Sequence, residues 1–209
     1  WICGLPYVRR VDRKFPCIEL VAAPVMQHPR YQQRPVYFSD VVVRSDREYG
    51  CFTDLRGASW AYNETGSQSG YNITRYHLAA LGESKGYFGR VIEAGSHLRA
   101  LEMVLDGAVD ASAIDSTVLE IEMDLQPRLK TQLRVIDVLG PSPIPPWVVH
   151  KDVPPELRQA IREALWQMHE GEPGRSILEE HGLLKMAPVQ DEDYEPIRAM
   201  ALMADEVIW

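Results

Sequence analysis

The sequence has little of the features that mark several common protein classes. It contains only three cysteines, an odd number that is too small for a disulfide framework. No apolar run approaches the roughly 18 residues of a membrane-spanning helix. Lysine and arginine number 22 against 30 aspartates and glutamates, and no run of basic residues is long enough to make a basic patch. This charge balance predicts that the chain does not bind nucleic acid, because a polyanion would be repelled.

Metal and nucleotide signatures are also missing. The six histidines show no zinc-like spacing, the cysteines form no CxxC pair, and no P-loop occurs. We therefore expect no metal and no cofactor. Three buried thiols are the simplest interpretation of Cys3, Cys17 and Cys51, with a bridge between Cys3 and Cys17 as the alternative.

The amino end shows no basic segment followed by an apolar one, so no signal peptide is visible. The chain begins at Trp1 and not at Met, with residues typical of an interior strand. We therefore expect that a segment upstream of Trp1 was removed or not included.

What the chain does contain is an α/β pattern. With 209 residues, 45% of them hydrophobic and 25% charged, it can bury a core as one domain or as two small lobes. Short β-branched runs alternate with helical spacing, which favours mainly parallel sheets flanked by helices. The expected strands are 1–8, 18–22, 36–43, 58–62, 90–93, 111–114, 133–138 and 147–149, and the expected helices are 69–81, 97–105, 117–124, 155–168, 175–180 and 192–203.

Two segments look like passages between lobes. One is the long β-branched run at 35–44, and the other is the proline-rich segment at 140–146, which cannot be helical. They divide the chain into a discontinuous first lobe, residues 1–43 with 141–209, and a second lobe, residues 44–140.

The polar chemistry of the second lobe gathers where three expected strands end and helices begin. The corners are Asn63–Gly70, Ala94–His97 and Asp115–Thr117. Because the carboxyl ends of parallel strands face one crevice, these corners should lie close together. Glycines around Ser67 and Ser69 allow backbone N–H groups and a helix amino end to bind an oxyanion without a lysine. The alternative for each corner is an ordinary helix cap with turn glycines.

The other two corners fit the same chemistry. A neutral His97 at a helix start can donate to an anion. A carboxylate at Asp115 suits only an anion that keeps a proton, as a phosphate or phosphonate monoanion does. A surface or packed histidine, and a capping aspartate, are the alternatives.

These residues resemble the phosphonate-type substrate-binding proteins of ABC transporters, which have the two-lobed type II periplasmic binding protein fold. The resemblance extends from Cys3–Tyr7 to about Leu165. The motifs that carry it are Tyr37–Ser39, Val41–Arg44, Asp54–Gly57, Ser67–Gly70, Gly95–His97, Asp106–Asp110, Ala113–Ser116 and Asp152–Leu157.

The resemblance implies a set of ligand-binding residues: Tyr37, Ser67, Gln68, Ser69, His97 and Asp115, with Ser39 as a weaker candidate. It also implies a phosphorus oxyanion as ligand, hinge closure between the lobes, a membrane permease as partner, a monomeric state and a periplasmic or extracytoplasmic location. The usual Ser-Thr-Ser of the family reads Ser-Gln-Ser here, and the opening strand–helix–strand of the family is not found.

Two other functions remain open from the sequence. One is a binding or sensor protein for another small ligand, such as a sulfonate. The other is an enzyme on the same scaffold that uses His97 and Asp115 as acid–base partners, since a fold does not determine function.

Overall fold

The computed structural model describes residues 1–14 and 16–209. The chain forms two compact units, Trp1–Val36 with Ser142–Arg198 and Tyr37–Pro141 with Ala199–Trp209. We call them unit 1 and unit 2 and describe each by itself. Unit 1 holds α1 (Gly4–Val11), β1 (Ile18–Met26), η1 (Pro29–Tyr31), β7 (Trp147–His150), α6 (Pro155–Trp166), α7 (Glu172–Glu180), β8 (Leu183–Ala187) and η4 (Asp191–Tyr194).

Three elements contribute residues to both units: β2 (Val36–Arg44), β6 (Leu133–Pro143) and α8 (Glu195–Ala204). The other elements of unit 2 are η2 (Phe52–Leu55), β3 (Ser59–Tyr62), η3 (Gln68–Asn72), α2 (Ile73–Ala80), β4 (Arg90–Glu93), α3 (His97–Leu105), β5 (Ala111–Asp115), α4 (Ser116–Leu125) and α5 (Leu129–Gln132).

The sheet of unit 2 has the order β4-β3-β5-β2-β6. Strand β3 runs parallel to both β4 and β5, whereas β2 runs antiparallel to β5. The three parallel strands therefore end at one edge of the sheet, and each is followed by a helix: η3 with α2, α3 and α4 respectively. This edge carries the three polar corners that the sequence predicts.

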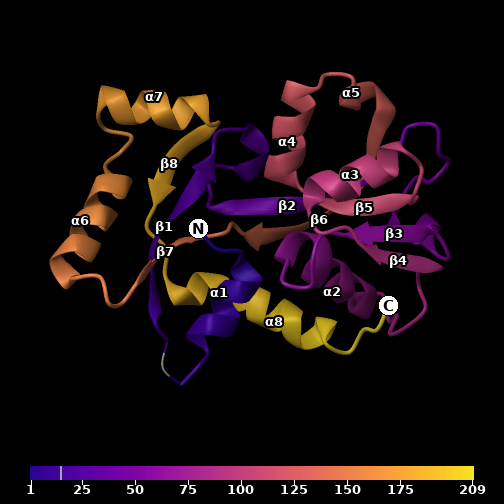
Figure 1. The fold of residues 1–209 in the computed structure, drawn as a ribbon, viewed down its shortest axis with the longest axis horizontal. Helices are drawn as coiled ribbons and strands as arrows, with labels where there is room; N and C mark the ends of the chain where they lie inside the picture. Colours follow the sequence, from indigo (N-terminus) through magenta and orange to yellow (C-terminus); the bar gives the residue numbers. More distant parts are fainter. Residues whose placement is uncertain (15) are drawn as a thin grey trace. The chain divides into compact units, whose positions relative to one another are not determined.

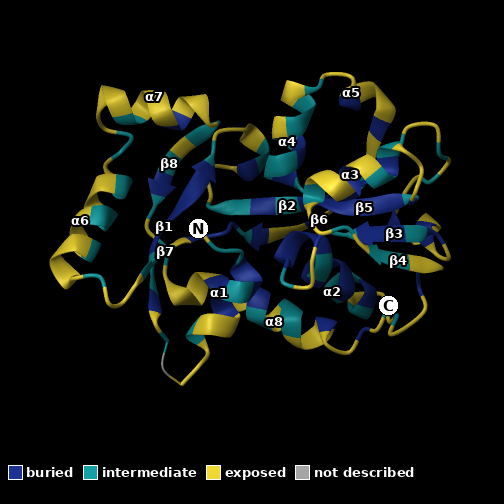
Figure 2. Ribbon diagram, viewed as in Figure 1, coloured by how far each residue is buried: buried dark blue, intermediate teal, exposed yellow. Residues whose placement is uncertain are grey.

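Alternating side chains give this sheet two buried faces. Trp60 and Val41 pack on one face with Leu78 of α2, while Ala61 and Val42 pack on the other with Leu101 of α3. Figure 1 shows α2 on one side of the sheet and α3 and α4 on the other. The central strands β5 and β2 are buried along most of their length (Figure 2), so the middle of the sheet forms a packed base for its polar ends.

The sheet of unit 1 has the order β7-β1-β8, and both pairings are antiparallel. The first half of β1 pairs with β7 and the second half with β8. A small cluster of Val21, Ala22, Leu178 and Met186 joins β1 to α7 and β8. Helix α6 has no buried residue and is exposed along most of its outer face (Figure 2).

The expected α/β class with helices around two sheets is confirmed, but parallel pairing is narrower than expected. Parallel pairing joins β3 to β4 and β5, whereas the strands of unit 1 pair antiparallel with one another and β2 pairs antiparallel with β5. Strand β8 and the short α5 were not expected from the sequence.

The first expected strand is wrong, because residues Gly4–Val11 form the helix α1. Leu5 and Val8 are three residues apart and both are buried, which is the helical spacing that an apolar run can hide. Arg9 and Arg10 lie in the last turn, where positive charge stabilises a helix end.

Residues 199–209, expected in the first lobe, lie in unit 2. Val207 is buried in the core cluster beside α2, and Trp209 packs against the same cluster. The Arg75 guanidinium donates two hydrogen bonds, of 3.1 and 2.8 Å, to the Val207 carbonyl. Residues 37–43, also expected in the first lobe, belong to unit 2 as part of its sheet.

The prediction of three buried thiols is also wrong. All three cysteines are free, Cys17 and Cys51 are exposed, and Cys3 is half-buried. Within the described ranges, no helix combines the length and the apolar character that crossing a membrane requires.

Candidate functional site

The first corner is a tightly capped turn between β3 and α2. Ser67 is the N-cap of the π-helical turn η3, and its hydroxyl accepts a hydrogen bond of 3.0 Å from the Gly70 N–H. Ser67 and Ser69 are each 3% exposed. The turn continues directly into α2, so the amino end of one helical segment lies at this corner. The expected cap is therefore present, and it leaves the Ser67 hydroxyl hydrogen available for donation.

A hydrogen bond joins the first corner to the second. The Ser69 Oγ lies 3.0 Å from the His97 Nε2, and His97 is the first residue of α3, whose N-cap is Ser96. Burial lowers the pKa of His97 from 6.5 to about 4, so the imidazole is neutral at pH 7. The His97 Nδ1 is buried without a hydrogen-bond partner. Two strands far apart in the sequence thus bring a hydroxyl and a neutral imidazole together.

Asn63 is a residue of this site that the sequence reasoning missed. It follows β3 directly, is 8% exposed, and its Oδ1 is buried without a hydrogen-bond partner. A Cβ at Gly70 would overlap this amide oxygen and would lie 3.1 Å from the His97 Cε1. The missing side chain of Gly70 therefore leaves the space that the Asn63 amide and the His97 ring need beside the turn. The sequence feature that could have identified Asn63 is its position as the first residue of the polar corner.

At the third corner, Asp115 is the N-cap of α4. Its Oδ1 accepts hydrogen bonds from the Thr117 N–H at 2.9 Å and the Thr117 hydroxyl at 2.7 Å. Burial nevertheless raises the pKa of Asp115 to about 6, against the lowering effect of these hydrogen bonds. The capping alternative is thus correct for one carboxylate oxygen, and any ligand would have to use the other oxygen.

Strand β2 brings two further candidates to the third corner. Ser39 is the register partner of Asp115, and it is 1% exposed. The Phe38 N–H donates to the Ser116 Oγ at 3.0 Å, which fastens the start of α4 to β2. Tyr37 lies on the same face of β2 as Ser39, since side chains alternate, and its side chain is buried.

The side chain of Gln68 makes its contacts away from Ser67 and Ser69. Its side chain is fully buried; its Nε2 donates to the Met200 Sδ at 3.2 Å, and its Oε1 accepts from the Asn72 Nδ2 at 2.8 Å. The side-chain amide at the middle of Ser-Gln-Ser therefore joins the turn to α8. Any part of Gln68 in ligand binding would fall to its backbone.

An open hollow lies beside this group. It has a volume of about 480 Å³ and begins at Asn63 and His97. The residues that line it are Asn63, Glu64, Gly95, Ser96, His97, Leu98, Val118, Ile121 and Glu122.

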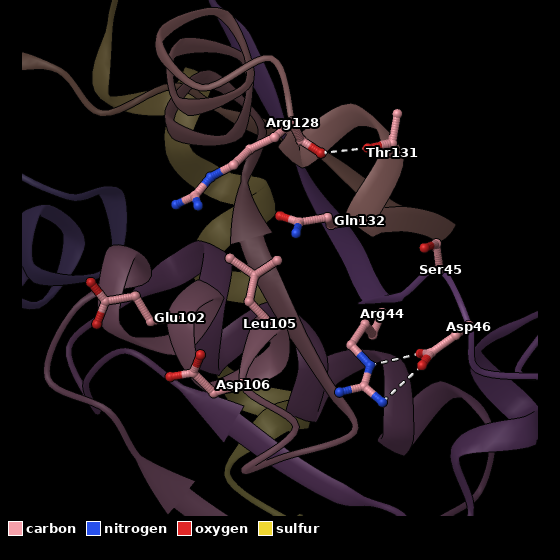
Figure 3. A pocket seen from close by; sticks show the side chains of 9 residues that line it. All are labelled: Arg44, Ser45, Asp46, Glu102, Leu105, Asp106, Arg128, Thr131 and Gln132. Carbon is pink, nitrogen blue, oxygen red and sulfur yellow. Dashed lines mark hydrogen bonds and ion pairs between the residues drawn. The ribbon is translucent and has the colours of Figure 1, made fainter.

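A larger hollow, of about 570 Å³, lies elsewhere in unit 2 (Figure 3). Arg44 lines it, and the neighbouring Val43 pairs with Ala111 at the start of β5, so this hollow is at the opposite end of β5 from Asp115. The Arg44 guanidinium makes two hydrogen bonds to the Asp46 carboxylate, at 2.7 and 2.8 Å. The lining also holds Arg128, but the three carboxylates of Asp46, Glu102 and Asp106 outnumber the two guanidinium groups, so the size of this hollow does not make it the anion site.

Within the described part of the chain, no group of three or more His, Cys, Asp or Glu side chains is arranged to hold a metal ion. The hydrogen-bonding groups of the three corners suit an anion instead.

Comparison with known proteins identifies the family of the chain and relatives of its fold. A sequence model described as "ABC transporter, phosphonate, periplasmic substrate-binding protein" matches residues 1–194. Among similar solved structures is a binding protein component of an ABC phosphonate transporter from Pseudomonas aeruginosa, at a TM-score of 0.84 and 20% identity, covering 98% of this chain and 68% of that one.

Two more structures are similar in fold. PhnD1 from Prochlorococcus marinus, solved in complex with methylphosphonate, has a TM-score of 0.81 and 18% identity, covering 98% of this chain and 77% of that one. A Xanthomonas citri protein bound to ATP has a TM-score of 0.69 and 16% identity, covering 90% and 71%. The matched family consists of substrate-binding components and not of enzymes. The chain belongs to the family of periplasmic substrate-binding proteins of phosphonate ABC transporters.

Proposed function

We infer that this chain binds a small phosphorus oxyanion (a phosphonate, phosphate or phosphite) at the carboxyl edge of the unit 2 sheet. The observation that carries the proposal is the 3.0 Å hydrogen bond between Ser69 Oγ and His97 Nε2. It joins two helix starts at one buried point, where their amide dipoles favour negative charge. Ser67, Ser69 and His97 supply the donors from side chains, and Gln68 contributes through its backbone.

Asp115 accounts for the choice of phosphorus. A carboxylate repels an anion unless that anion carries a proton to donate. A hydrogen phosphate or a hydrogen phosphonate has such a proton near neutral pH, and a sulfonate has none. Since burial already favours the protonated form of Asp115, with a pKa of about 6, one proton shared between ligand and carboxyl avoids the repulsion.

Tyr37 of β2 completes the proposed site, and Ser39 on the same strand is a weaker candidate. In the mechanism we propose, the oxyanion first binds at the three corners of unit 2, which forms the second lobe. Closure of the first lobe then encloses the ligand, and a membrane permease of an ABC transporter recognises the closed form. The active protein is proposed to be a monomer in the periplasm.

The test is isothermal titration calorimetry with methylphosphonate, phosphate, phosphite, sulfate and taurine. We expect the phosphorus ligands to bind and the two sulfur ligands to bind far more weakly. Ser69→Ala should lower the affinity about tenfold or more, because a hydrogen bond to a charged group contributes about 1.5–3 kcal/mol. Ser45→Ala, an exposed serine of unit 2, is the matched control. The proposal fails if no phosphorus oxyanion binds, or if Ser69→Ala binds as tightly as Ser45→Ala.

A further inference from the structure

We propose that a smaller hollow of unit 2 binds an organic amine that has an ammonium group at one end and an apolar body at the other. The hollow has a volume of about 270 Å³, and its lining comes from α2, from β6 and from the part of α8 that belongs to unit 2. The lining residues that carry the argument are Ile73, His77, Asp137, Val138, Leu139 and Met200. This inference goes beyond the proposed function and does not depend on it, because the residues proposed to hold the oxyanion do not line this hollow.

One side of the hollow is apolar and rests on the core of unit 2. Ile73 is 1% exposed and Leu139 is 4% exposed, and both belong to the core cluster that contains Trp60. Met200 packs against the same cluster but is only half-buried, and Val138 is 45% exposed. A ligand that covers Met200 and Val138 removes apolar area from water, which is favourable. An aromatic body gains further from the Met200 thioether, because sulfur makes favourable contacts with ring edges.

The hollow also contains a carboxylate with unused hydrogen-bonding capacity. Asp137 lies on β6, the last strand of the sheet, and is half-buried. Its Oδ1 accepts a hydrogen bond of 2.8 Å from the Val138 N–H. A carboxylate can accept about four hydrogen bonds, so most of this capacity is open to a ligand. No lysine or arginine is among the described residues that line the hollow.

His77 of α2 adds a second acceptor near this carboxylate. Its ring is half-buried and packs edge-on against Phe52, with the ring centroids 4.5 Å apart. Among the described residues, the ring nitrogens of His77 have no hydrogen-bond partner. Burial lowers the pKa of His77 below its usual 6.5, while the Asp137 carboxylate acts in the opposite direction. The imidazole is therefore neutral at pH 7 and offers one ring nitrogen as an acceptor.

These groups determine which end group fits the hollow. An ammonium has three N–H donors and a positive charge, which match the Asp137 carboxylate and the His77 nitrogen. An anionic end would be repelled by Asp137. A purely apolar ligand would take the carboxylate out of water without a partner, which is unfavourable. A metal ion would lack ligands, because the described residues form no group of three or more His, Cys, Asp or Glu side chains that could hold one.

The test is a titration followed by two-dimensional NMR of the backbone amides. The probe is 2-phenylethylamine, which is protonated at pH 7 and has an aromatic body; 2-phenylethanol and 3-phenylpropionate are its uncharged and anionic counterparts. With roughly nine non-hydrogen atoms, the amine should bind with a Kd of about 0.1–10 mM. It should bind about five- to tenfold tighter than the alcohol, and the propionate should bind most weakly. The largest saturating shifts should fall on the amides of residues 73–77 and 137–139.

The variant Asp137→Asn should bring the ratio of the amine and alcohol affinities close to one. Its amide oxygen can still accept from the Val138 N–H, so the variant should keep the fold, which the amide spectrum verifies directly. Asp106→Asn is the matched control, because it makes the same change in net charge at an exposed residue of unit 2 that does not line this hollow. It should keep the wild-type ratio. That ratio should fall as salt concentration rises.

The amine should still bind in the presence of saturating methylphosphonate, because the two sites are separate. The proposal is overturned if binding of the amine does not saturate below about 10 mM, or if the largest shifts lie outside the two stretches named. Displacement of the amine by methylphosphonate, or a ratio that Asp137→Asn leaves unchanged, would overturn it as well. Binding of the amine without any binding of methylphosphonate would support this site and contradict the proposed function.

Discussion

Gly70→Ala tests the packing that brings the corners of unit 2 together. The added Cβ would overlap the Asn63 Oδ1 and would lie 3.1 Å from the His97 Cε1, so Asn63 and His97 must both move. Inserting a methyl group into a packed site reduces the free energy of unfolding by about 1–3 kcal/mol. For a chain of this size each kcal/mol lowers Tm by about 2–4 °C, so Tm should fall by roughly 2–12 °C.

The same substitution should weaken methylphosphonate binding about tenfold or more, because a shift of about 1 Å in positioning groups is costly at a site of fixed geometry. Differential scanning calorimetry gives the first quantity and isothermal titration the second. Gly50→Ala is the control, since a Cβ there meets only the Asp54 carboxylate at 3.4 Å. The double variant Gly70→Ala/Asn63→Gly removes the overlap and should recover most of the lost Tm. Wild-type Tm and affinity in Gly70→Ala would show that Asn63 and His97 are not packed against Gly70.

Two further predictions concern stability. His97 has a folded pKa of about 4, below its ordinary 6.5, so between pH 6.5 and 4 the unfolded chain binds more protons than the folded one. The wild type should therefore lose stability relative to His97→Gln as the pH falls from 6.5 to 4. Asp115 should have the opposite effect on the pH dependence of stability. Its folded pKa is raised from 3.8 to about 6, so the wild type should gain stability relative to Asp115→Asn over the same fall in pH. Urea unfolding at several pH values checks both slopes, and parallel curves for the wild type and the variants would contradict them. Arg75→Met should reduce the free energy of unfolding by about 1–3 kcal/mol, because it leaves the buried Val207 carbonyl without its two donors. An unchanged urea midpoint in Arg75→Met would show that this carbonyl finds another donor.

Where sequence periodicity was clear, it predicted the fold. Strands β3, β4 and β5 and the helices that follow them were expected within a few residues of their observed bounds, because each strand is followed by a corner with its own N-cap, such as Ser67 or Ser96. The prediction failed where the same residue pattern is compatible with both a strand and a helix. Residues 1–8 read as a strand by apolar content, yet Leu5 and Val8 are buried at helical spacing in α1.

Pairings between distant segments could not be predicted. Nothing local in residues 199–209 indicates that Val207 will pack beside α2, since that contact depends on Arg75, more than a hundred residues earlier. The antiparallel pairing of β2 with β5 is of the same kind.

The candidate site was likewise predictable only in part. The three corners were found from strand ends and residue type, and the resemblance added their order. The direction of each side chain was not available from the sequence: Gln68 is directed toward Met200, and Asn63 is directed toward Gly70. Both orientations depend on packing between elements, which a linear pattern does not contain.

The interleaved order of the units affects folding during synthesis. Unit 2 is nearly complete once residue 141 has been made, yet its core still lacks Val207. At roughly 5–20 residues per second, the ribosome needs about 3–14 s to add the remaining segment up to residue 209. During that interval the core cluster that contains Leu78 and Phe88 lacks its member Val207, so part of its apolar surface stays open to water and to chaperones. The nascent chain therefore passes through a stage in which a finished sheet awaits its last packing partner.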